Sequence, residues 1–161
     1  MQIPHLNLVL AWLGILLGFI SGLYLGLNFQ RDDWLGGYGS FKRRLYRLGH
    51  ISFFGLAAIN FMFYFTVRAS AASGSTVVAA SAAFVVGAVS MPLCCLLMAH
   101  FPRTHLLFGV PVTSLILGAA LTVLILCGAT PSPVASAALD SLLTQNPLPM
   151  TDYQSVATNH P

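Results

Sequence analysis

The chain has 161 residues, of which 57% are hydrophobic and only 7% are charged. This number of charged side chains is too small to cover the surface of a water-soluble domain. The composition therefore excludes a water-soluble globular protein and indicates a small protein that crosses a membrane several times. The net charge of +3 does not indicate a nucleic-acid partner, because the basic residues gather between apolar runs, where they fit the membrane surface.

Four apolar runs are long enough to cross a lipid bilayer as helices. A helix rises about 1.5 Å per residue, so roughly 20 apolar residues cross the hydrocarbon layer. We therefore predict an all-α membrane protein, a bundle of four transmembrane helices, with spans at about residues 6–27, 48–67, 77–100 and 105–127. The segment 129–161, rich in Pro, Ser and Thr, is expected to be a flexible tail outside the bundle.

The first apolar run contains a regular pattern of glycines, with Gly14, Gly18, Gly22 and Gly26 at every fourth position. Residues four apart share one face of a helix, so these glycines form a groove that another helix can approach closely. Packing against another helix of the same chain is the favoured interpretation. A seam between two copies of the chain, a glycine zipper, is the alternative.

The segment 28–50 holds seven of the eleven charged residues of the chain. Ser40 is expected to cap a helix that begins at Phe41, because its hydroxyl can accept a hydrogen bond from a free backbone N–H. The cations at positions 42, 43, 44 and 47 are expected to lie among lipid phosphates. Asp32 and Asp33 are interpreted as part of a solvated turn rather than as a catalytic pair, since the sequence builds no pocket around them.

Three residues inside the later spans have a predicted structural role. Asn60 lies near the middle of the second span, where an unpaired amide is costly, so we expect it to hydrogen-bond to a neighbouring helix. Pro92 in the third span and Pro111 in the fourth each remove a backbone donor. A bend is therefore expected at each proline.

The basic residues predict the orientation of the chain. The connections 28–47 and 101–104 carry six of the seven Lys and Arg residues, whereas the opposite side carries only Arg68. Cytoplasmic loops are enriched in Lys and Arg, so we place these connections in the cytoplasm and both termini on the non-cytoplasmic side. A bacterial inner membrane is the default location.

Three histidines are expected at a similar depth near the cytoplasmic face, because His50 opens the second span, His100 closes the third and His105 opens the fourth. Imidazole nitrogen ligates heme iron, zinc and copper, and ligand sites in bundles are built from facing helices. We therefore predict a heme b site with His50 and either His100 or His105 as axial ligands and Arg47 as propionate partner. The alternative is that these histidines simply suit the membrane interface.

The third span also contains soft sulfur donors at helical spacing. Met91, Cys94 or its neighbour Cys95, and Met98 can share one stripe that suits Cu(I). Apolar packing of these adaptable side chains is the favoured interpretation.

The sequence lacks a phosphate-binding glycine-rich loop with its Lys, a nucleophile elbow and a His-Glu-x-x-His helix. We therefore expect a small non-enzymatic subunit or assembly partner of a membrane complex, associated with respiratory heme or copper proteins. The alternatives are a cofactor-free scaffold or self-associating protein, and a Cu(I)-handling membrane protein.

Overall fold

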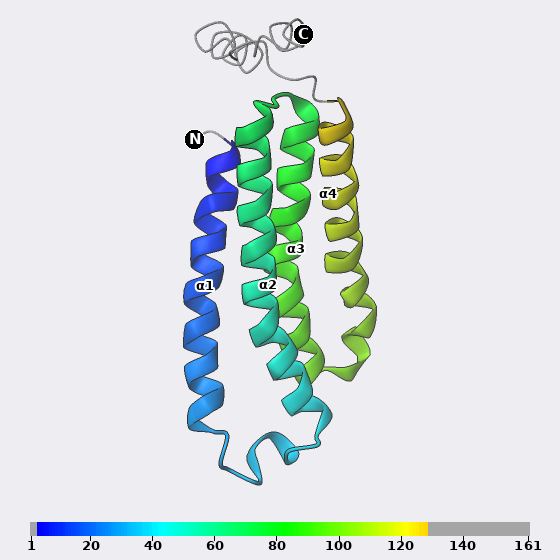
Figure 1. Ribbon diagram of the computed structural model, residues 1–161. Helices are drawn as coiled ribbons and strands as arrows, with labels where there is room; N and C mark the ends of the chain where they lie inside the picture. Colours follow the sequence, from blue (N-terminus) through cyan, green and yellow to red (C-terminus); the bar gives the residue numbers. More distant parts are fainter. Residues whose placement is uncertain (1–2, 129–161) are drawn as a thin grey trace, which may run out of the picture. The chain divides into compact units, whose positions relative to one another are not determined.

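The computed structural model describes residues 3–128, and these residues form helices without any strand. Four long helices follow one another up and down (Figure 1): α1 (Ile3–Leu27), α2 (Phe41–Ser70), α3 (Ser75–His100) and α4 (Gly109–Gly128). Each of the four helical segments is long and apolar enough to cross a membrane. The predicted all-α, four-span architecture is thus confirmed, whereas the predicted tail lies outside the described residues.

The helices pack in the order of the sequence, α1 against α2, α2 against α3 and α3 against α4. α1 also touches α3, but α1 and α4 make no substantial contact within the described residues. In the described residues, the four helices therefore lie side by side in sequence order, with α1 and α4 as the two outer helices. The connections 28–40 and 101–108 lie at the same end of the helices (Figure 1). The side of the membrane that these connections face stays a prediction.

The first connection contains a short 3-10 helix, η1 (Trp34–Gly36), and ends at the cap of α2. Ser40 accepts a hydrogen bond from the backbone N–H of Arg43 at 3.2 Å, and its hydroxyl donates to the carbonyl of Leu35 at 2.7 Å. The predicted cap is therefore confirmed. The helix begins seven residues before the apolar span at 48, because the cap and not hydrophobicity decides where the helix starts.

The second 3-10 helix, η2 (Pro102–Phe108), delays the start of α4 to Gly109. This start is later than the expected position 105, and it places Pro111 in the first helical turn. A backbone N–H in the first turn has no partner inside the helix, so Pro111 removes no hydrogen bond from the middle of α4. By contrast, Pro92 lies inside α3, as the sequence predicts.

A buried polar cluster joins the first three helices. The side-chain amide of Asn7 donates to Asn60 Oδ1 at 2.8 Å, and the hydroxyl of Ser81 donates to Asn7 Oδ1. Asn60 also donates to the carbonyl of Leu56 at 2.8 Å. The three polar side chains are at most 1% exposed. The predicted interhelical hydrogen bond of Asn60 is therefore confirmed, with Asn7 of α1 as its partner.

The glycine pattern of α1 lies mainly against α2 of the same chain. A Cβ atom at Gly14 would lie 3.2 Å from an α2 backbone carbonyl, and one at Gly18 would lie 2.7 Å from a phenylalanine ring of α2. A Cβ atom at Gly22 would lie 2.8 Å from the ring of His50, whereas Gly26 has nothing within 4 Å. A second role of these glycines between two copies of the chain stays a prediction.

Candidate functional site

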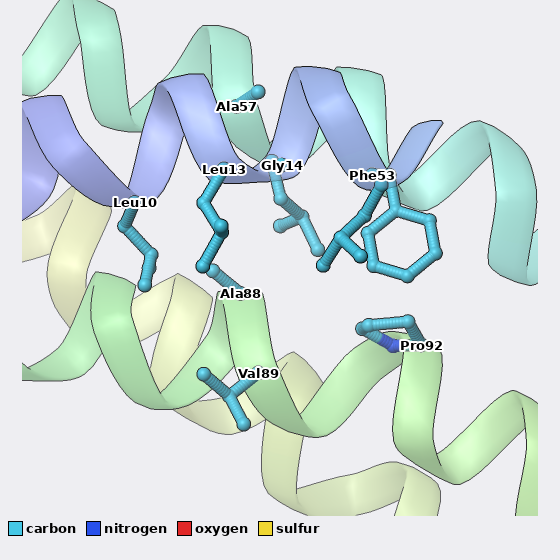
Figure 2. Close-up of a pocket in the computed structure, with 10 residues that line it drawn as sticks. Leu10, Leu13, Gly14, Phe53, Ala57, Ala88, Val89 and Pro92 are labelled. Carbon is cyan, nitrogen blue, oxygen red and sulfur yellow. The ribbon is translucent and has the colours of Figure 1, made fainter. Parts of the chain in front are cut away.

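An apolar groove runs between α1 and α3, with α2 as its floor; we call it the α1–α3 groove. It has two sections, with volumes of about 160 Å³ and about 370 Å³. Leu17, Phe53 and Pro92 line both sections, so the two sections adjoin each other. Figure 2 shows the smaller section, where Leu10 and Leu13 point from α1 towards α3.

His50 is the main polar feature of the larger section. Its Nδ1 lies 3.0 Å from the hydroxyl oxygen of Ser21 on α1, and that hydroxyl donates to the carbonyl of Gly18 at 3.0 Å. A hydroxyl has only one proton to donate, so Ser21 can accept from Nδ1–H of His50. This arrangement favours the tautomer with the proton on Nδ1, in which Nε2 carries the acceptor lone pair.

The position of the His50 ring is fixed on two further sides. Gly22 leaves room for the ring on α1, and the ring of Phe54 lies edge-on to it with the centroids 5.4 Å apart. Among the side chains that the structure describes, none forms a hydrogen bond with His50 Nε2. The imidazole is therefore held in place with one acceptor nitrogen available to a metal ion or to a hydroxyl donor.

His100 has a different partner from His50. Its Nε2 lies 3.0 Å from the hydroxyl of Tyr46, which stands one turn before His50 on α2 and also lines the larger section. The side chain of His105 lies outside the described part of the structure. Among the described side chains, no group of three His, Cys, Asp or Glu residues could hold a metal ion. The predicted pairing of His50 with His100 or His105 on a heme stays a prediction.

The arginine at position 43 does not lie among lipid phosphates, so that expectation is wrong. Arg43 is 3% exposed, and its guanidinium donates to the carbonyl of Phe29 at 2.6 Å. It lies between 5.0 and 5.8 Å from the ring centroids of Phe29, Trp34 and Tyr38. The connection 28–40 folds back over the first turn of α2, so cation–π contacts and backbone carbonyls replace lipid phosphate.

Arg47 also holds this connection. Its guanidinium donates to the carbonyl of Tyr38 at 3.2 Å and lies 5.0 Å from the centroid of the same ring. Its predicted role as propionate partner stays a prediction. The aromatic residues that follow α1 are the sequence signal from which this arrangement could have been found.

The sulfur-containing stripe of α3 is occupied by packing contacts. The thiol of Cys94 donates to the carbonyl of Leu107 at 3.4 Å. Cys95 is fully buried, and a Cβ atom at Gly49 of α2 would lie 3.4 Å from the Cβ atom of Cys95. Cu(I) binding by Met91, Cys94 and Met98 stays a prediction.

The larger section of the α1–α3 groove thus combines an oriented imidazole with an apolar surrounding inside the predicted membrane layer. Such an arrangement can ligate a metal or accept one hydrogen bond from a bound molecule. Comparison of the chain with protein-family models, with curated proteins and with solved structures gives no match.

Proposed function

We propose that this protein is a small non-enzymatic membrane subunit that binds a membrane-soluble ligand in the α1–α3 groove, with His50 as the polar contact. The supporting observation is the anchored ring of His50, which is bonded to Ser21 through Nδ1 and lines the groove. A polar group inside the hydrocarbon layer normally has a partner, and an ionisable residue there is by default a functional one. A ligand that donates to Nε2 supplies this partner.

The same contact argues against hydrolytic catalysis. Ser21 and His50 are the residue types of a nucleophile and its base, but the Ser21 proton goes to the carbonyl of Gly18. A serine becomes a nucleophile only when the adjacent base takes its proton. No Asp or Glu lines either section of the groove to orient such a base.

The test is the retention of a ligand during purification in mild detergent. Ala88 lines the smaller section, so Ala88→Phe fills the groove, whereas Val86 on the same helix is 46% exposed and lies outside the lining. We expect mass spectrometry to find one amphiphilic compound with the wild-type protein and with Val86→Phe, and to lose it with Ala88→Phe. His50→Ala should lower its amount, whereas His100→Ala should not. Equal recovery from all these variants would refute the proposal.

Heme b is a second candidate for the same site. Histidines that ligate a metal almost always donate their other ring N–H to a protein acceptor, and Ser21 is placed to accept from Nδ1 of His50. A Soret band in the purified protein that disappears in His50→Ala would support heme. A colourless protein without metal would exclude it, and with it the predicted association with respiratory heme or copper proteins.

A further inference from the structure

We infer that the ligand of the α1–α3 groove is an uncharged amphiphile with a hydroxyl-bearing ring as its head and one long apolar chain, the chemistry of a prenylated quinol. This inference rests on the proposed function and names the class of the ligand. Four features of the groove support it: its charge, its depth, the chemistry around His50 and its width.

The lining of the groove disfavours an anionic head group. Neither section contains a Lys, Arg, Asp or Glu residue. Arg43 and Arg47, which precede the groove on α2, are already bonded to backbone carbonyls of the first connection, and Arg44 between them is exposed and lines neither section. An ion without a partner is costly in the hydrocarbon layer. A phosphate or carboxylate head therefore has no counter-ion in the groove, whereas a neutral head needs none.

The depth of His50 in the membrane also favours a ligand other than a phospholipid. Ser21 and Gly22, which hold the His50 ring, lie six and five residues before the end of α1 at Leu27. A rise of about 1.5 Å per residue puts this point about 9 Å inside the helix end. Phospholipid head groups lie at the membrane surface, so a head that reaches His50 belongs to a molecule that lies deeper.

The side chains around His50 favour a ring that carries a hydroxyl group. In the favoured tautomer, with the proton on Nδ1, Nε2 of His50 is an acceptor, so the head must bring a donor. Tyr24, Tyr46 and Phe53 line the same section and offer aromatic surfaces. Aromatic rings pack well against another ring in offset or edge-on arrangements. The volume of about 370 Å³ is in the range of small-molecule sites.

The smaller section favours a single flexible chain. The two adjoining sections together extend along α1 from Leu25 to Leu10, which is about 22 Å at the rise of a helix. An α-helix with its side chains is about 10–12 Å across, so a helix from a second copy cannot enter a section of about 160 Å³. An acyl or prenyl chain is thin enough to follow this path.

The test compares two probes on delipidated protein in detergent, a decyl-substituted hydroquinone and its dimethyl ether, which lacks both hydroxyl donors. We expect His50→Ala to lower the affinity for the hydroquinone about three- to tenfold, which corresponds to the loss of one hydrogen bond. Binding of the ether should be unchanged by this substitution. His50→Gln should keep part of the affinity because its amide oxygen is an acceptor, and His100→Ala is the matched control. Because both probes are measured on each variant, a general loss of folding affects both equally.

Three outcomes would overturn the inference. In the first, both probes respond equally to His50→Ala although this variant keeps the helical circular dichroism of the wild type. In the second, dodecanol or phosphatidylglycerol binds the wild-type protein more tightly than the hydroquinone. In the third, the protein carries a Soret band that depends on His50. If Ala88→Phe still removes a retained compound in any of these cases, the proposed groove function stands and only the ligand class is wrong; if no compound is retained, both fail.

Discussion

Replacing Asn60 with Leu should destabilise the protein by about 1–2 kcal/mol, because it removes the acceptor of the Asn7 amide. The Asn7 side chain is 0% exposed, so water cannot replace that acceptor. A buried donor without a partner costs about 1–3 kcal/mol. Measured interhelical hydrogen bonds in a membrane protein average about 0.6 kcal/mol and reach at most about 1.7 kcal/mol, which limits the upper end of the effect.

The double variant Asn7→Leu/Asn60→Leu separates this hydrogen bond from other losses. When both partners become apolar, no donor is left unpaired, so the double variant should be more stable than the sum of the single effects implies. Ser81, which donates to Asn7, can return its proton to a carbonyl of its own helix. We expect a coupling free energy between Asn7 and Asn60 of about 0.6–1.7 kcal/mol.

The assay is equilibrium unfolding in mixed micelles by titration with a denaturing detergent, followed by helical circular dichroism. Thr66→Val serves as the control, because Thr66 donates only to a carbonyl of its own helix. Its effect should stay within about 0.5 kcal/mol. Single effects that add within about 0.3 kcal/mol would refute the argument that Asn7 and Asn60 act as a pair.

Three further predictions concern packing, the first connection and orientation. Gly18→Leu should lower the free energy of unfolding by about 1–3 kcal/mol, because its Cβ atom would lie 2.7 Å from the Phe54 ring. A Cβ atom at Gly26 has nothing within 4 Å, so Gly26→Leu should be neutral in the same assay. Arg43→Leu should make chymotrypsin cut the connection 28–40 roughly thirtyfold faster than the wild type, because a desolvated cation–π contact contributes about 2 kcal/mol; equal rates would contradict this. Gly39→Cys in a background without the native cysteines should react with an impermeant maleimide in inverted vesicles and not in intact cells, and the reverse pattern would overturn the orientation.

The number of helices and the start of α2 were predictable because their signals are local. Long apolar runs determine where a chain can cross the hydrocarbon layer, and the hydroxyl of Ser40 caps the turn that follows it. The hydrogen bond of Asn60 was predictable for a similar reason. A buried amide must have a partner wherever the neighbouring helix happens to be.

The partners across helices could not be read from the sequence in the same way, because they depend on the rotation of each helix about its axis. The pairing of Asn7 with Asn60 and of Ser21 with His50 follows from that rotation. One signal was available. In an antiparallel hairpin, a step of four residues forward on α1 matches a step of four residues back on α2. Once the structure places Gly18 against Phe54, this rule places Gly22 against His50.

The buried Arg43 was missed for another reason. Its neighbours in sequence are cations, and a run of cations beside an apolar span is usually solvated or bound to phosphate. The structure differs because the first connection places three aromatic rings and a backbone carbonyl around the guanidinium. Lys42, the cation next to it, is exposed.

The close packing of α1 on α2 creates both parts of the candidate site. Because Gly14, Gly18 and Gly22 carry no side chain, α1 lies close to α2 and accepts the His50 ring in the space above Gly22. The neighbouring face of α1, with Leu10, Leu13 and Leu17, is then left opposite the small side chain of Ala88 on α3. A leucine face opposite an alanine does not fill the space between the two helices, so the groove remains open. The orientation of the imidazole and the existence of the groove are therefore two consequences of one glycine pattern.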